Sequence, residues 1–205
     1  MGDYIQYPRY SIYLIPSNSF FKDLNLFYKK NNLNFQTLAQ STYGIHFTVK
    51  APFYKSHVYS ENNLIDQFNS IKKNLIQNIF NKNYNIIQIS KFKRNLILEL
   101  ERDPELYFVI HELMRTFDQY RKTLNDDEIK IDLLRFDDLS EKEMMYYQIW
   151  GYPYYFECSK HHISLSHYIS KFISHDFQPI KYNSLKLLKQ EKLGEPFKDL
   201  SAIIS

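Results

Sequence analysis

Two short segments of this chain carry the same alternating pattern, and the pattern is typical of a β-strand. The first, H-F-T-V, begins at His46, and the second, H-I-S-L, begins at His162. Successive side chains of a strand point to opposite faces of its sheet. Each histidine would therefore share a face with a hydroxyl residue, Thr48 in the first segment and Ser164 in the second. The apolar residues between them would pack into a core on the other face.

Two imidazoles and two hydroxyls in one cleft would suit chemistry at a phosphate. The imidazoles can transfer protons, and the hydroxyls can donate hydrogen bonds to phosphate oxygens as charge develops. A single H-x-[ST]-x match is common by chance, and either histidine could be an ordinary surface or core residue. Two matches with the same apolar flanks favour a shared site. The sequence therefore predicts His46, Thr48, His162 and Ser164 as catalytic residues.

Other residues near the two segments are candidates for substrate binding. Lys50 continues the alternation of the first segment, so we expect it on the face of His46 and Thr48. There it would either pair with a substrate phosphate or extend into solvent. Tyr43 and Tyr154 would either line the pocket or simply pack.

Composition limits the class of protein. A chain of 205 residues with 44% hydrophobic residues fits one domain, or two small lobes that share a core. The net charge of +3 is interspersed, which favours a small phosphorylated substrate or a short oligonucleotide over a long nucleic acid. No apolar run reaches transmembrane length, and no signal-peptide pattern opens the chain, so we expect a cytoplasmic protein without membrane contact.

A metal or cofactor is not expected. His161, His162 and His167 are close in sequence, but no carboxylate stands near them at ligand spacing. The pair His111-Glu112 lacks the second histidine of H-E-x-x-H, and the chain has no glycine-rich phosphate loop. The single cysteine, Cys158, excludes an intramolecular disulfide.

Apolar periodicity and helix caps predict an α+β fold with antiparallel sheets. Helix starts are indicated at Ser60, at Asp103-Pro104 and at the capping box that begins at Ser140. Residues 125–138 are acidic and are expected to form a loop or an insertion. The remaining expected elements are strands at 9–15, 45–50, around 162–165 and on either side of Gly194, a helix at 20–30, and a hairpin formed by 84–89 and 96–100.

The residues around the first motif resemble a known family. Residues 43–53 read Y-G-I-H-F-T-V-K-A-P-F, which is similar to the Y-G-F-H-A-T-L-K-A-P-F run of one branch of the two-histidine (2H) phosphoesterase superfamily. Genes of that branch often stand beside phosphonate-utilisation genes. Three more segments resemble the same branch in the same order: R-Y-S-I-Y at 9–13, F-D-Q-Y-R at 117–121 and W-G-Y-P-Y at 150–154.

The resemblance implies a fold and an activity. Residues 1–205 would form one two-lobed domain, with the motifs near 43–53 and 160–166 on inner strands beside a central groove. The implied reaction is metal-independent hydrolysis of a cyclic phosphodiester in a small metabolite. RNA ends that bear a cyclic phosphate, or binding of a phospholigand without turnover, remain alternatives. Arg121 matches a family position and is a candidate substrate-binding residue.

Two departures from the family pattern stand near the second motif. Ser164 replaces the more usual threonine, which keeps the hydroxyl and loses only a methyl group. The stretch 166–179 leaves room only for a short helix, where the family usually has a long one.

Overall fold

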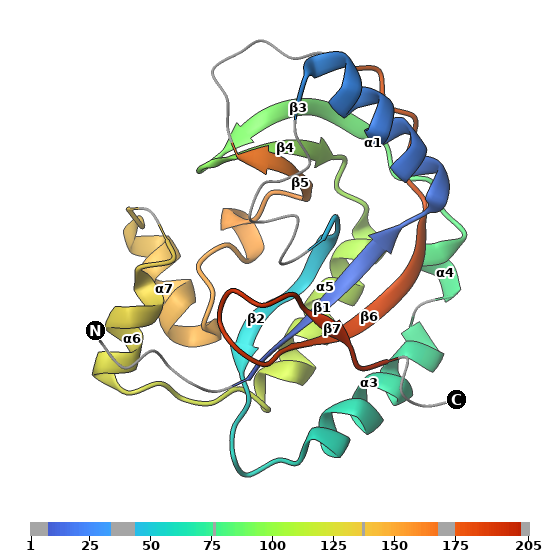
Figure 1. Cartoon of the computed structure of the whole chain (residues 1–205). Coiled ribbons are helices and arrows are strands. Elements are labelled where there is room, and N and C mark those ends of the chain that lie inside the picture. Colours follow the sequence, from blue (N-terminus) through green and yellow to red (C-terminus); the bar gives the residue numbers. More distant parts are fainter. Residues whose placement is uncertain (1–7, 34–43, 76, 137, 168–174, 202–205) are drawn as a thin grey trace.

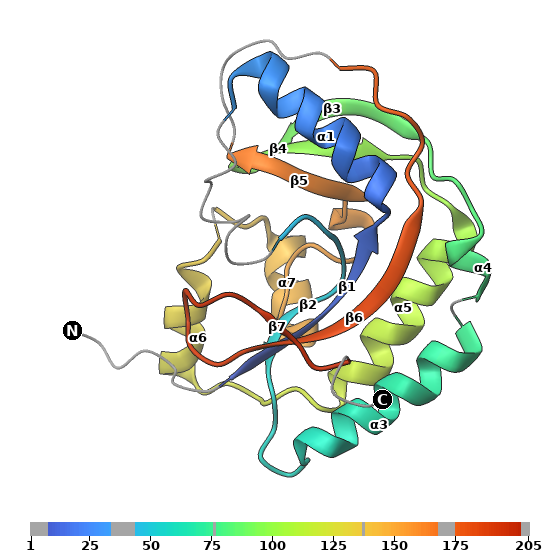
Figure 2. The ribbon, with the colours of Figure 1, turned by 45° about the vertical axis from the view of Figure 1, so that its right-hand side comes forward.

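The computed structural model describes residues 8–33, 44–75, 77–136, 138–167 and 175–201 (Figure 1). These residues form an α+β fold built on one seven-stranded antiparallel sheet, in the order β3-β4-β5-β2-β1-β6-β7. The sheet curves, and the bend of the long strand β6 is plain in Figure 2. The strands are β1 (Arg9–Pro16), β2 (Phe47–Tyr54), β3 (Ile86–Phe92), β4 (Asn95–Leu100), β5 (His162–His167), β6 (Tyr182–Gln190) and β7 (Lys198–Asp199).

Helices pack against the sheet and join its core. The helices α1, α3 and α5 contribute side chains to the same apolar core as β1, β2, β4, β5 and β6. The helices α6 and α7 lie together on the other side of the molecule, at the left of Figure 1. The helical segments are α1 (Asn18–Asn31), α3 (Glu61–Leu75), α4 (Gln77–Phe80), α5 (Pro104–Asp118), α6 (Asp126–Leu133), α7 (Glu141–Trp150) and a 3-10 helix (Phe156–Cys158).

Local sequence signals account for several boundaries. The Asp103 carboxylate accepts a hydrogen bond from the Leu106 N–H at 2.8 Å and starts α5. Ser140 opens α7 with the expected capping box. The expected hairpin is confirmed as β3 and β4, and its turn holds Lys93 at φ 52°.

One expected loop is a helix. Residues 126–133 form α6, which begins with a capping box between Asn125 and Glu128. The pattern N-x-x-E at 125–128 is a helix-start signal, and it outweighs the acidic composition that favours a loop. The short helix expected after the second motif falls largely on residues 168–174, outside the described residues.

The sheet has a seam between β2 and β5. These strands are neighbours, but their register contains only the pair Phe47 and Ile163. On one side of the seam lie β3, β4 and β5, and on the other lie β2, β1, β6 and β7. The two motif strands are therefore the inner strands of two groups within one continuous sheet.

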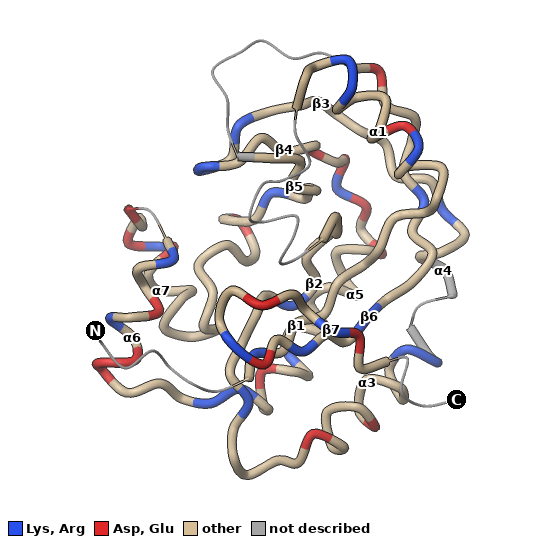
Figure 3. The backbone as a smooth tube through the Cα atoms, viewed as in Figure 1, with Lys and Arg blue, Asp and Glu red and all other residues tan. Residues whose placement is uncertain are grey.

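Charged residues of both signs are spread along the described backbone (Figure 3). Among the helices of the described chain, none combines the length and the apolar character that a bilayer crossing requires.

Candidate active site

The seam brings the two histidine motifs side by side. Phe47 of β2 pairs with Ile163 of β5, and both side chains are buried in the apolar core. Paired residues in an antiparallel sheet share a face. The residues before and after each of them must therefore project from the opposite face of the sheet.

The four motif residues occupy that opposite face. Thr48 and His162, which are sequence neighbours of that one register pair, line the same small cavity. We therefore expect the two imidazoles and the two hydroxyls to face one shared site.

The backbone fixes the orientation of both imidazoles in the same way. The Nδ1 of His46 lies 2.9 Å from the carbonyl oxygen of Gly44, and the Nδ1 of His162 lies 2.7 Å from that of Lys160. A carbonyl oxygen only accepts, so each Nδ1 carries the hydrogen and donates it. The Nε2 of each neutral ring then holds the lone pair. In His46 this nitrogen lies 3.2 Å from the Thr48 hydroxyl oxygen.

Aromatic rings pack against both histidines. The Tyr13 ring stacks on His46, with centroids 3.6 Å apart and planes 10° apart. The Phe92 ring lies 5.3 Å from His162 and 5.4 Å from Tyr154. Tyr154 is therefore brought beside the second motif, as a pocket-lining role requires. Tyr13 stands in the segment R-Y-S-I-Y, but its stacking depends on strand pairing that the sequence does not show.

Burial is the main cause that lowers the pKa of His162, and the ammonium charge of Lys160 acts in the same direction. The hydrogen bond to the Lys160 carbonyl and the charge of Glu99 act against that shift. Glu99 is held by its own partners, among them Lys160 at 3.2 Å. His162 is therefore neutral at pH 7, with the lone pair on Nε2.

Lys50 does not lie where alternation predicts. One step along β1, from Ile12 to Tyr13, corresponds to two steps along β2, because Ile12 pairs with Lys50 and Tyr13 with Thr48. This β-bulge puts Lys50 and Thr48 on opposite faces. Lys50 is 1% exposed, and its ammonium lies 2.8 Å from Asp118. The expected place of Lys50 beside His46 and Thr48 is therefore wrong.

Lys50 belongs to a buried ion-pair network with Asp118 and Arg121. Burial lowers the pKa of Lys50 to about 8, although the Asp118 charge opposes this shift. Arg121 donates to both oxygens of Asp118, at 2.9 and 3.2 Å, and to the carbonyl of Ile149 at 2.7 Å. Gly151 has φ 70°, and a Cβ added there would lie 2.8 Å from the Arg121 side chain, so a larger residue would be strained and would displace Arg121. Arg121 thus anchors the end of α7, and its contact with substrate remains a prediction.

The segment after α7 is bound to β2. The Ala51 N–H of β2 donates to the Tyr155 hydroxyl oxygen at 3.1 Å. Tyr155 is 5% exposed and packs with Ala51 and Met114. Tyr155 was not among the residues predicted from the sequence, although it directly follows the W-G-Y-P-Y run. Tyr43, another candidate, lies outside the described residues.

A small cavity lies beside Thr48 and His162. Its volume is about 30 Å³, and its lining includes Thr48, Tyr154 and His162. In the part of the chain that the structure describes, no group of three or more His, Cys, Asp or Glu side chains is placed to hold a metal ion. The motif residues can transfer protons through their imidazoles and donate hydrogen bonds through their hydroxyls.

Comparison with known proteins gives a family for the chain. No curated protein sequence matches it. Residues 48–198, more than half of the chain, match a protein family; this range includes Thr48, His162 and Ser164, and it begins two residues after His46. The chain therefore belongs to the family described as "Protein of unknown function (DUF1045)".

Proposed function

We propose that this protein hydrolyses a cyclic phosphodiester in a small phosphorylated metabolite, using two histidines and no metal. The observation that supports the proposal is the pairing of Phe47 with Ile163, which makes the two motif strands neighbours, together with the cavity that Thr48 and His162 both line. Both imidazoles also have Nδ1 committed to a backbone carbonyl, so we assign proton transfer to Nε2, which in His46 lies 3.2 Å from the Thr48 hydroxyl oxygen.

The reaction needs one base and one acid at the same phosphorus. One neutral Nε2 takes a proton from water as the water oxygen forms a bond to phosphorus. The protonated Nε2 of the other histidine gives its proton to the ester oxygen as that P–O bond breaks. The products are a phosphomonoester and a free hydroxyl in the same molecule. Thr48 and Ser164 donate hydrogen bonds to the non-bridging oxygens as negative charge grows on them.

The burial of His162 supports an assignment of the two roles. His162 is the base, because burial lowers its pKa and keeps its Nε2 unprotonated at pH 7. His46 is then the acid. The stacked Tyr13 ring keeps the His46 ring in one orientation.

The architecture supports a relationship to the 2H phosphoesterases. The motif strands β2 and β5 are the inner strands of two groups that meet at a seam with a single register pair. We propose that these groups correspond to the two lobes of that superfamily. The continuous sheet is then the result of the pairing between Phe47 and Ile163.

The proposal is tested with a panel of cyclic phosphodiesters followed by ³¹P NMR. The panel contains small polyol cyclic phosphates, nucleoside 2′,3′-cyclic phosphates and short RNAs that end in a cyclic phosphate. We expect ring opening of a small member, at the same rate with and without EDTA. Loss of turnover in EDTA with recovery in Zn²⁺ or Mn²⁺ would contradict the mechanism. Preference for the RNAs would instead favour RNA-end processing.

A further inference from the structure

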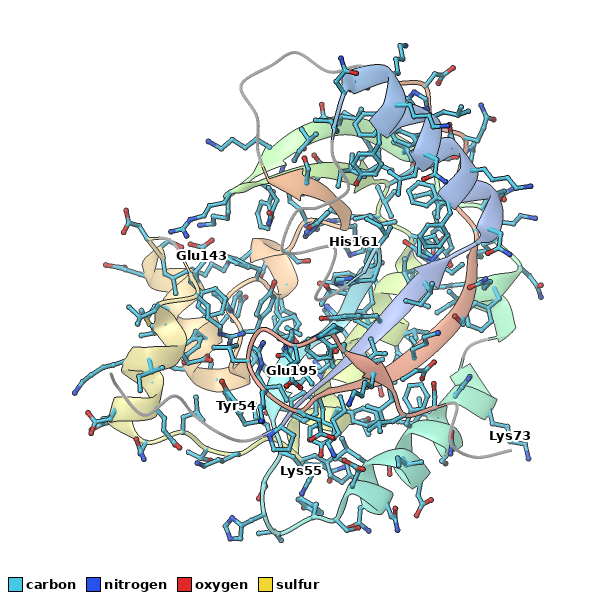
Figure 4. All side chains as sticks on the ribbon, in the orientation of Figure 1. Tyr54, Lys55, Lys73, Glu143, His161 and Glu195 are labelled. Carbon is cyan, nitrogen blue, oxygen red and sulfur yellow. The ribbon has the colours of Figure 1, made fainter. Side chains whose placement is uncertain are left out.

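The loop between β6 and β7, residues 191–197, is bound to the start of β1. Gln190, the last residue of β6, is 1% exposed, and its Nε2 donates to the Glu195 carbonyl oxygen at 2.6 Å. The Oε1 of Gln190 accepts from the Nε of Arg9, the first residue of β1, at 2.9 Å. The labelled Glu195 marks this loop near the middle of Figure 4. Buried polar contacts therefore hold the loop against β1.

The last residue of the loop, Phe197, packs against Tyr13 of β1. The centroids of the two rings lie 6.0 Å apart and their planes are 50° apart, a separation typical of packed aromatic pairs. Tyr13 is 1% exposed. It pairs with Thr48, so both side chains project from the same face of the sheet. The loop thus reaches the face that carries the first motif.

Tyr13 in turn supports the imidazole of His46. Their centroids lie 3.6 Å apart and their planes are 10° apart, so one ring lies flat on the other. The hydrogen bond from Nδ1 to the Gly44 carbonyl is exposed to water and holds the imidazole at only one point. The χ2 torsion of histidine is broad, so this bond alone leaves the ring free to tilt. The stack removes that freedom and keeps Nε2 beside the Thr48 hydroxyl, 3.2 Å away.

We propose that Tyr13, backed by Phe197 from the β6–β7 loop, is the positioning residue for His46. This inference rests on the proposed function, in which His46 is the acid. Tyr13 is buried and takes no part in proton transfer or substrate binding. Its effect is to keep the Nε2 of His46 in line with the ester oxygen that leaves. A misplaced acid slows the chemical step and changes substrate binding little, so the loss of Tyr13 should fall on kcat.

Kinetics on a compound that the unaltered protein hydrolyses test this role. Tyr13→Leu removes the ring, and kcat should fall roughly 10–100-fold with little change in KM. Tyr13→Phe keeps the ring and should retain most of kcat, because the stack and not the hydroxyl supports His46. Phe197→Ala, at a partly exposed position, should lower kcat by a smaller factor. Phe108→Ala is the matched control, since Phe108 is 57% exposed on α5.

Three kinetic results would overturn the proposal. The first is an unchanged kcat in Tyr13→Leu, confirmed as folded by circular dichroism; if that variant does not fold, an unchanged kcat in Phe197→Ala decides the question in the same way. The second is a loss confined to KM, which would indicate contact with substrate. The third is an equal loss in Tyr13→Phe and Tyr13→Leu, which would assign the effect to the hydroxyl.

Proton NMR tests the geometry without a substrate. The Tyr13 ring should shield the carbon-bound protons of the His46 imidazole, whose signals are identified by their absence in His46→Ala. In Tyr13→Leu, and to a smaller extent in Phe197→Ala, these signals should move downfield while those of His162 stay in place. Unshielded His46 signals in the unaltered protein would overturn the positioning role. Shielded signals without hydrolysis of any compound in the panel would overturn the proposed function and leave the support of His46 by Tyr13 standing.

Discussion

Each motif histidine is oriented by the carbonyl two residues before it, and this local arrangement decides what the imidazole can do. The distances are 2.9 Å for His46 and 2.7 Å for His162. The bond fixes the tautomer of the neutral ring, and it supports the charged ring, because a protonated imidazole still donates from Nδ1. The same residue type can thus serve as a base at one position and as an acid at the other.

The first prediction concerns the two histidines. His46→Ala and His162→Ala should each lower kcat by roughly 10²–10⁴-fold, because each removes one proton-transfer group. The double variant should lose much less than the product of the two, since both groups act on one phosphate. Steady-state rates and circular dichroism provide the measurement, and His57→Ala is the control. A rate close to that of the unaltered protein in either single variant would contradict the assignment of both histidines as proton-transfer groups.

The second prediction concerns pH. The profile of kcat/KM should be bell-shaped, because the base must be neutral while the acid is protonated. The pKa of His162 is lowered by burial, so the acid limb should lie below the ordinary histidine value of about 6.5. In His162→Ala the residual activity should lose this acid limb, and in His46→Ala it should lose the alkaline limb. The limbs of the unaltered protein belong to the coupled pair.

Between elements, a buried ion-pair network connects β2, the end of α5 and the segment after α7. Lys50 is 1% exposed, and its nearest counter-charge is Asp118. The pKa of Lys50 is lowered, which means that the desolvation cost of burying its ammonium exceeds the stabilisation of its charge by Asp118. The network is therefore a poor source of stability, and its effect is to hold β2 and the Trp150–Tyr155 segment in one arrangement beside the motifs.

The third prediction tests that network. Asp118→Ala should lower the free energy of unfolding by about 3–5 kcal/mol, because it leaves the Lys50 ammonium buried without its partner. Adding Lys50→Met should recover much of this loss. The control is Asp127→Ala, which breaks an exposed pair with Lys130 and should cost less than about 1 kcal/mol. Urea unfolding measures the free energy of unfolding of all three variants. Equal decreases in Asp118→Ala and Asp127→Ala would contradict the prediction, because the buried pair would then contribute no more than the exposed one.

For the whole molecule, the buried neutral His161 links folding to pH. Burial lowers its pKa in the folded protein to about 4, from about 6.5 when exposed. The unfolded chain therefore binds a proton first as the pH falls. The stability that depends on neutral His161 is complete above about pH 6.5 and is lost progressively toward pH 4.

The fourth prediction follows from this difference in proton binding. Between pH 6.5 and pH 4 the free energy of unfolding should fall by about 3 kcal/mol through His161 alone. Other groups also titrate in this range, so the measurement is the difference between the unaltered protein and His161→Phe in urea unfolding at each pH. Parallel curves for the two proteins would contradict the prediction.

Much of the fold was predictable from local patterns. Alternation located the strands of both motifs and the hairpin of β3 and β4, and caps located the starts of α5 and α7. These features follow from interactions within a few residues. The start of α6 also depends on a local signal, the capping box of Asn125 and Glu128, but the acidic composition of this stretch favoured a loop.

Tertiary structure decided the rest of the site. The sequence alone identified two histidine and hydroxyl pairs, but only the sheet order makes β2 and β5 neighbours and aligns Phe47 with Ile163. The tertiary structure also puts Lys50 on the face opposite Thr48. The β-bulge responsible can be recognised only when β2 is compared with its partner strand β1. The stacked Tyr13 and the interior cavity likewise arise from contacts between segments that are distant in sequence. Side-chain alternation is a property of one strand, whereas register, bulges and cavities are properties of the partners that pack against it.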